Sequence, residues 1–201
     1  MNVVVEKLRE IDVLKENEVY RHLAELVDRL ELKDGYVGEH TTAVSRLALA
    51  IAAQLGFGGD QRRQVELGAL LHDVGKVFVP DRILTKPGRL NELELALLRR
   101  HAASGERLIA RILDLPDVLG VVRSHHERWD GRGYPDGKRA EEIPLAARIV
   151  AVADAFQAMI EPRPYREPRE PRTRAAALEE IRSEAGRQFD PACVEALLAV
   201  A

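Results

Sequence analysis

The sequence contains almost no cysteine and no long apolar run. Its 201 residues include a single cysteine, Cys193, so an internal disulfide and a cysteine-based zinc finger are both excluded. We interpret Cys193 as a residue on a helix face. No stretch of about 18 apolar residues occurs, and no signal-peptide pattern is present. These absences predict a cytoplasmic protein without a membrane span.

An excess of charge of one sign is also missing. The 30 basic and 33 acidic residues give a net charge of −3, which does not favour non-specific binding to DNA. The hydrophobic content of 46% and the charged content of 31% are ordinary for a globular protein. A chain of this length is expected to form one compact domain with a stable core.

Convincing strand patterns are absent, and the apolar residues recur at helical spacing instead. No internal repeat is found, and no linker is long enough to divide the chain. The pattern predicts an all-α bundle of about seven to nine helices. Residues 1–33 are expected to form an N-terminal helical segment, acting as a linker or a dimerisation helix, and residues 34–201 the main domain.

The chain has six histidines, and five of them lie in stretches that suggest a site. The central stretch is Leu71–Lys76, which contains the adjacent pair His72 and Asp73. Helical spacing before this pair predicts a helix that ends here, with Gly75 as its stop. Adjacent side chains at a helix end reach different points of one pocket. An isolated pair of this kind is more often a buried histidine beside an aspartate, but the other histidines argue against that reading.

Further candidate donors lie elsewhere in the chain. A carboxylate inside an apolar helical run, as at Asp154, is costly unless it is paired or bound to metal. Histidine and carboxylate without thiolate form the donor set for iron, manganese, nickel or zinc. His22 is interpreted as a plain surface or packing residue. The candidate metal ligands are therefore His40, His72, Asp73, His101, His125, His126 and Asp154.

Seven donors exceed what one tetrahedral ion needs, and they fit two ions that share a bridging carboxylate. Such a site clamps the attacking and leaving oxygens of a displacement, which suits phosphodiester hydrolysis. Lys76, Arg163 and Arg166 are the cations available to neutralise phosphates. The alternative for the Pro- and Arg-rich segment 161–172 is a solvated connector.

A long polar loop between Glu127 and Ile143 adds a second motif, because loops of this length are usually functional. The stretch His72–Lys76 resembles the metal motif of the HD superfamily of phosphohydrolases. Gly131–Pro135 resembles the signature of its HD-GYP subfamily, and the resemblance extends from about Asp34 to Pro191. It implies a helical fold, a binuclear or trinuclear metal site, and hydrolysis of the bacterial second messenger cyclic di-GMP to pGpG or GMP.

Carried over by matching position, the resemblance implies that the seven candidate residues are the metal ligands and that Asp73 bridges the ions. It also implies that Lys76 assists at the scissile phosphate and that Arg163 and Arg166 contact the nucleotide. The segment Gly133–Pro135, with Tyr134 at its centre, is expected to dock a partner protein or to form the substrate rim. The implied cofactors are two divalent ions, with iron or manganese favoured.

Four positions depart from the family pattern. Tyr36 stands where trinuclear members carry a glutamate, so two ions are expected rather than three. Gln157, Ile160 and Ala102 also differ from the usual residues, although none of them removes a ligand. Two alternatives therefore stay open: a metal-retaining module that acts through its loop on partners, and a hydrolase for another nucleotide. A homodimer is a further expectation that the sequence does not decide.

Overall fold

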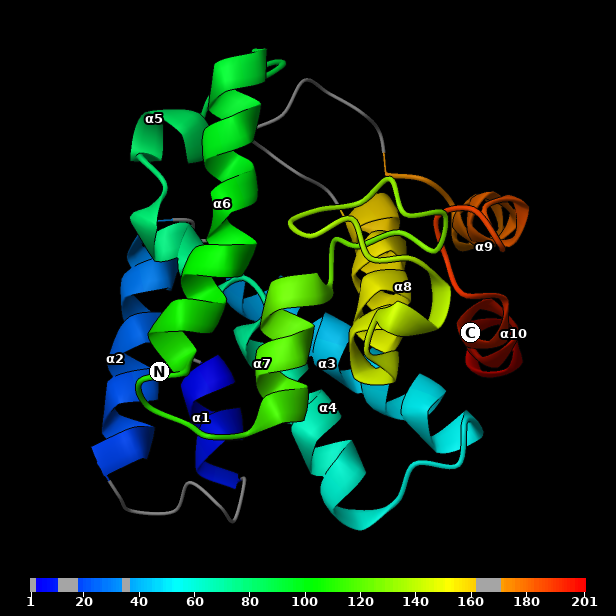
Figure 1. The fold of residues 1–201 in the computed structure, drawn as a ribbon, viewed down its shortest axis with the longest axis horizontal. Helices are drawn as coiled ribbons and strands as arrows, with labels where there is room; N and C mark the ends of the chain where they lie inside the picture. The colour runs from blue at the N-terminus through cyan, green and yellow to red at the C-terminus, as the bar shows by residue number, and fades with distance from the viewer. Residues whose placement is uncertain (1–2, 11–17, 34–36, 162–170) are drawn as a thin grey trace.

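The computed structural model describes residues 3–10, 18–33, 37–161 and 171–201. Helices and loops make up these ranges (Figure 1), and within them no strand is formed beyond one isolated bridge between Ala185 and Phe189. The predicted all-α fold is confirmed. The α-helices are α1 (Val3–Glu10), α2 (Glu18–Lys33), α3 (Val37–Gln54), α4 (Gly59–Leu71), α5 (Asp81–Leu84), α6 (Glu92–Ile109), α7 (Pro116–Ser124), α8 (Leu145–Ile160), α9 (Arg174–Ser183) and α10 (Pro191–Val200).

Two short 3-10 helices, η2 (Val74–Phe78) and η3 (Ala140–Glu142), complete the described elements. The ten α-helices of the described ranges exceed the seven to nine expected. One addition is α5, a single turn of four residues in a loop rich in proline and glycine. A single turn is too short to show an apolar period, so sequence pattern cannot reveal it.

Two apolar clusters form the core, and α4 belongs to both. Val65 and Ala69 belong to a cluster that includes residues of α3, α8, α9 and α10, whereas Leu67, Leu70 and Leu71 belong to one that includes residues of α1, α2, α6 and α7. The last five residues of α4, Leu67–Leu71, are buried and apolar, as expected for a segment enclosed by other helices. Its end, where the His72–Asp73 pair follows, lies between the two halves of the molecule.

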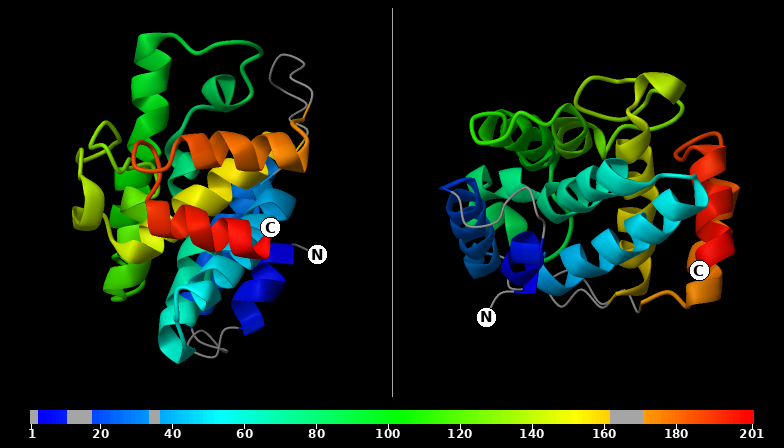
Figure 2. Two further views of the ribbon diagram at one scale, coloured as in Figure 1. Left: turned by 90° about the vertical axis from the view of Figure 1, so that its right-hand side faces the viewer. Right: turned by 90° about the horizontal axis from the view of Figure 1, so that it is seen from below.

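The C-terminal helices cover α8 on the side away from α6. Figure 2 (left) shows α9 and α10 lying across α8. Ile181 and Cys193 are fully buried in the same cluster as Phe156 of α8, so Cys193 is a packing residue on a helix face, as predicted. The side chains of Thr173 and Asp190 cap α9 and α10.

The N-terminal segment is helical and packs into the second cluster through Val4, Leu8 and Leu23, which are fully buried. The ammonium group of Lys33, at the end of α2, donates to the carbonyl oxygens of Val77 and Val79 at 2.9 and 3.1 Å. The segment thus contacts η2 directly. Its treatment as a unit apart from residues 34–201 stays a prediction.

Gly75 does not end a helix, contrary to the expectation from sequence. The helix α4 ends at Leu71, with His72 as its C-cap, and Gly75 lies inside η2. A Cβ atom on Gly75 would lie 2.0 Å from the carbonyl oxygen of His101 and 2.6 Å from the amide nitrogen of Gly105. Glycine is needed because the backbone of η2 rests directly on α6, which brings His101 beside the His72–Asp73 pair.

None of the helices in the described ranges combines the length and apolar character that a bilayer span requires.

Gly75→Ala should therefore separate η2 from α6 and lower the free energy of unfolding by about 3 kcal/mol, since backbone atoms cannot move aside cheaply. Gly58→Ala is the matched control, because no atom lies within 4 Å of a Cβ at that position. Urea unfolding of both variants measures the difference. Equal stability of the two variants would contradict the close-packing account of Gly75.

Candidate metal centre

The seven candidate donors come from five separate segments and meet in one place. They lie in the first turn of α3, in the turn after α4, in the middle of α6, after the end of α7 and within α8. Within each of two groups, one ligand atom per residue lies within 4.8 Å of the others. The first group is Asp73, His101, His125 and His126, and the second is His40, His72 and Asp154.

Asp73 lies between the two groups. Its Oδ1 is 3.3 Å from Nε2 of His101, and its Oδ2 is 3.4 Å from Nε2 of His72. The two oxygens of one carboxylate therefore face different groups of donors. This is the arrangement required of a carboxylate that bridges two ions, although the ligand assignments themselves stay predictions.

Three of the imidazole rings are oriented by the backbone of their own helices. The Nδ1 atoms of His72, His101 and His125 lie 2.7, 2.8 and 3.0 Å from carbonyl oxygens of the preceding turn. A ring that donates through Nδ1 presents the lone pair of Nε2 on its other side. In all three residues Nε2 faces the cluster. The accepting carbonyls belong to Ala69, Leu98 and Val122.

Two buried atoms at the centre indicate that metal ions fit this site. Nε2 of His72 and Oδ1 of Asp73 have no hydrogen-bond partner within the described part of the chain. Buried polar atoms nearly always have a hydrogen-bond partner. Two such atoms without one, on adjacent residues of the cluster, therefore indicate a bound ligand. Nitrogen and carboxylate oxygen donors are the set that divalent iron, manganese and zinc accept. The residues therefore form a cluster able to hold metal.

The electrostatics keep several of the histidines neutral. Burial lowers the pKa of His126 to about 3, and the neighbouring His101 acts in the same direction. Burial, with His126 and His72 nearby, holds the pKa of His125 well below its usual value. The neutral imidazole is the form that binds metal, so both rings are in their ligating state at neutral pH.

His40 differs from the other rings because carboxylates contact both of its nitrogens. Its Nε2 lies 3.0 Å from Oδ1 of Asp154, and its Nδ1 lies 2.7 Å from Oε2 of Glu161. Burial favours the neutral ring, but these hydrogen bonds outweigh it and raise the pKa of His40 to about 9. The sequence pattern does not single out Glu161, which begins the Pro- and Arg-rich segment 161–172. Its spacing of seven residues from Asp154 was the available signal.

Lys76 points into the centre from η2. Its Nζ lies 2.5 Å from Oδ2 of Asp73, and its side chain is 23% exposed. Burial would raise the pKa of Asp73, but Lys76 and His72 together hold it well below its usual value. The carboxylate is therefore ionised, and a cation stands beside it on the solvent side. Tyr36, Arg163 and Arg166 lie outside the described residues, so the expectations for them stay predictions.

The loop between α7 and α8 forms one wall of the site, with Tyr134 closest to the donors. The ring of Tyr134 stacks on His126, with centroids 4.8 Å apart and an angle of 29° between the planes. A Cβ on Gly133 would lie 2.4 Å from the amide nitrogen of Arg128, so glycine permits the loop to fold back on the turn after α7. The amides of Asp136 and Gly137 donate to Oε1 of the buried Glu127 at 2.7 and 3.1 Å.

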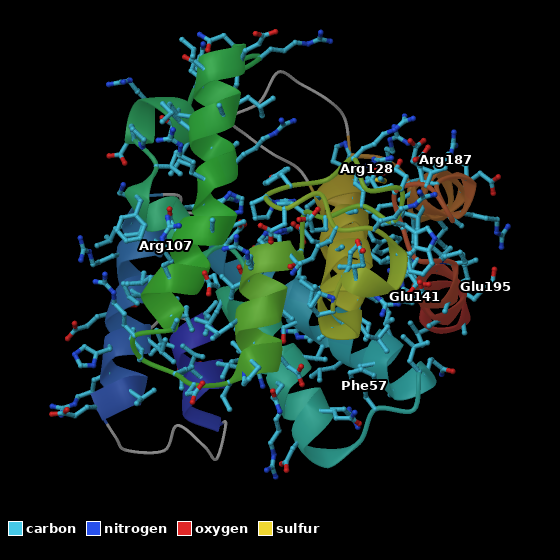
Figure 3. The ribbon with its side chains drawn as sticks, viewed as in Figure 1. Phe57, Arg107, Arg128, Glu141, Arg187 and Glu195 are labelled. Carbon is cyan, nitrogen blue, oxygen red and sulfur yellow. The ribbon has the colours of Figure 1, made fainter. Side chains whose placement is uncertain are left out.

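The same loop is fastened to the segment before α10. The amide of Asp130 donates to the carbonyl oxygen of Arg187 at 2.8 Å, and Arg128 pairs with Asp130 at 2.8 Å. Figure 3 shows Arg128 and Arg187 at this edge, beside α9. The loop that forms this wall is thus bonded both to the turn after α7 and to the segment before α10.

A pocket of about 210 Å³ opens beside the donors. Asp154 and His126 lie at its base, and Arg99, Arg132 and Tyr134 contribute to its lining. The guanidinium of Arg99 lies 5.2 Å from the centre of the Tyr134 ring. Positive charge and an aromatic face next to the candidate metal donors suit an anionic ligand that carries planar rings.

Comparison with known proteins finds a family profile, curated relatives and solved structures that are similar to this chain. The profile of the HD domain family matches residues 25–193. The chain is 42% identical over 180 residues to the "Cyclic di-GMP phosphodiesterase response regulator RpfG" of Xanthomonas campestris pv. campestris, which covers 88% of this chain and 46% of the relative. It is 34% identical over 175 residues to "3'3'-cGAMP-specific phosphodiesterase 2" of Vibrio cholerae, covering 86% of this chain and 33% of the relative.

Among solved structures, Bd1817, a HDG"Y"P protein from Bdellovibrio bacteriovorus, superposes with a TM-score of 0.66 at 24% identity, covering 83% of this chain and 53% of that one. This likeness shows the fold. The chain spans less than half the length of either curated relative. Since the family profile covers most of the chain and one relative is 42% identical over 180 aligned residues, the chain belongs to the HD domain family, in the HD-GYP group that its motifs resemble.

Proposed function

We propose that this chain is the catalytic part of a metal-dependent phosphodiesterase that hydrolyses cyclic di-GMP to pGpG, to GMP or to both. The observation that carries the proposal is the meeting of seven nitrogen and oxygen donors in two adjacent groups, with Asp73 of the first group also facing His72 of the second. The 42% identity to a cyclic di-GMP phosphodiesterase supports the choice of substrate. A cytoplasmic location is part of the same proposal, because a bacterial second messenger acts there.

The proposed cofactors are two divalent ions, iron or manganese, one in each group of donors. Bound there, the ions would supply Lewis acidity toward phosphate and activate water. Other groups of the chain orient the proposed ligand side chains and set their protonation state. Backbone carbonyls orient His72, His101 and His125, and burial keeps His125 and His126 neutral.

The cations around the donors are proposed to receive the substrate. Lys76 lies against Asp73 with part of its side chain exposed, so it can contact a phosphate without acting as a ligand. Arg99 and Arg132 line the adjoining pocket, where they add positive charge. Arg163 and Arg166 stay proposed nucleotide contacts on the strength of the family resemblance.

Two alternatives rest on specific observations. The Vibrio cholerae relative is named for 3'3'-cGAMP, so a mixed purine dinucleotide is the second candidate substrate. The alternative of a metal-retaining binding module would place a partner protein on the loop around Gly133–Pro135. Tyr134 lies against His126 rather than outward, which favours a function of this residue in the pocket. A homodimer remains part of the proposal.

Purified chain loaded anaerobically with Mn²⁺ or Fe²⁺ should bind two ions and hydrolyse cyclic di-GMP faster than 3'3'-cGAMP. Asp73→Ala should lose both most of the metal and the hydrolysis, because it removes the carboxylate that faces both groups of donors. Elemental analysis and chromatography of the products measure the two effects. Three tightly bound ions per chain, or an active Asp73→Ala variant, would contradict the assignment.

Lys76→Ala should keep both ions and lower turnover by roughly 10²–10³, because a charge-assisted contact to the phosphate is lost. As a cation beside Asp73, Lys76 opposes metal binding, so its removal cannot weaken the metal site. Lys138→Ala is the control: this lysine also contacts an aspartate, Asp136, at 3.8 Å, but outside the donor cluster. Wild-type turnover in Lys76→Ala would show that Lys76 pairs with Asp73 but does not assist hydrolysis.

The metal-free protein should lose stability as the pH falls below about 6.5. The pKa of His126 is about 3 in the folded chain against an ordinary value of 6.5. Between these values the unfolded chain binds a proton that the folded chain does not, so acid favours unfolding. The expected loss from this residue is about 1.6 kcal/mol between pH 6.5 and 5.

His126→Gln should reduce this loss of unfolding free energy at acidic pH. His22→Gln, at an exposed position on α2, should leave the loss unchanged. Urea unfolding in the presence of a chelator, at pH 7, 6 and 5, supplies the comparison. Parallel curves for wild type and His126→Gln would show that the ring is not held neutral by the fold.

A further inference from the structure

The segment just after α8 carries a carboxylate that the proposed chemistry does not use. Glu161 is the C-cap of α8, and its amide donates to the carbonyl oxygen of Gln157 at 3.0 Å. Its side chain is 17% exposed, so most of the carboxylate is withdrawn from water. The helix has no basic residue in its last turn. A negative charge at a helix C-terminus is unfavourable, so this position requires a compensating partner.

The partner is His40, contacted through the nitrogen that faces away from the donor cluster. Oε2 of Glu161 lies 2.7 Å from Nδ1 of His40, while Nε2 of the same ring lies 3.0 Å from Oδ1 of Asp154. Asp154 lies within α8, and Glu161 follows the last residue of that helix with an extended backbone, seven positions later. From there its carboxylate contacts the nitrogen of His40 that Asp154 does not contact.

The geometry separates Glu161 from the donors themselves. The group His40, His72 and Asp154 satisfies mutual distances within 4.8 Å among its ligand atoms, and Glu161 is not a member. Glu161 therefore stands behind His40 rather than beside it. The carbonyl oxygens of Ala69, Leu98 and Val122 hold the same position behind three of the other four rings, those of His72, His101 and His125.

We propose that Glu161 is a positioning residue that fixes the Nδ1–H tautomer of His40 and directs its Nε2 toward the metal ion of the second group. A carboxylate behind a ligating imidazole orients the ring and increases its basicity. Glu161 also adds a third carboxylate, after Asp73 and Asp154, and so further negative charge near the two proposed divalent ions. The inference rests on the proposed metal centre and names what completes it in this chain.

The test is titration of metal-free protein with Mn²⁺, followed by electron paramagnetic resonance of the free ion. The wild type should show two binding steps. Glu161→Ala should weaken one step by roughly 10–100-fold and leave the other step and the total of two ions unchanged. Glu161→Gln should recover part of the affinity, because its amide oxygen still accepts from Nδ1–H. Glu39→Gln, which removes an exposed acid next to His40 in sequence, should bind like the wild type.

A second readout follows the ring directly. At a Zn²⁺ concentration that saturates the wild type, ¹⁵N chemical shifts should report a His40 ring with zinc-bound Nε2 and protonated Nδ1 in the wild type and in most molecules of Glu161→Gln. In Glu161→Ala a large share of the His40 rings should be free of zinc. Wild-type affinity and a fully zinc-bound His40 ring in Glu161→Ala would overturn the proposal. So would a fall in the number of bound ions in that variant, which would make Glu161 a ligand. A wild-type chain that binds no Mn²⁺ would instead contradict the proposed function, and this inference with it.

Discussion

A carboxylate buried where two apolar clusters meet must be surrounded by cations or by groups that bind them, and Asp73 is that carboxylate. It is 7% exposed. An isolated charge in such a place is strongly disfavoured. Lys76 and the rings of His72 and His101 lie within 3.4 Å of its oxygens. The turn after α4, the 3-10 helix η2 and α6 each contribute one of these groups, so three segments meet at this carboxylate.

The junction of the two clusters exists because the last five residues of α4, Leu67–Leu71, are all buried and the helix ends at the centre of the molecule. The 3-10 helix η2 follows at once and lies directly on α6, which only a glycine at position 75 permits. This contact joins a turn that carries a carboxylate to a helix that carries His101. Backbone carbonyls then set the rings, so the precision of the donor set comes from helix geometry rather than from long side chains.

The loop between α7 and α8 closes the site on a third side. Its glycine at position 133 lets the chain fold against the turn that carries His125 and His126, and Glu127 ties the far part of the loop to that turn. Tyr134 reaches the pocket as a result. The sequence motif of the HD-GYP group is thus a structural part of the site wall in this chain, and Arg99 and Arg132 give the same wall its positive charge.

The sequence alone determined the helical class and the long loop and singled out the seven candidate donors, because helical period, breakers and adjacent polar residues are local properties. The tertiary structure decided how the donors divide into two groups, which nitrogen of each ring faces the centre, and why Gly75 is glycine. It also introduced Glu161, 121 positions away from His40. Such contacts depend on where α3 and α8 cross, and helix crossing is set by the packing of both apolar clusters rather than by any one stretch of the chain.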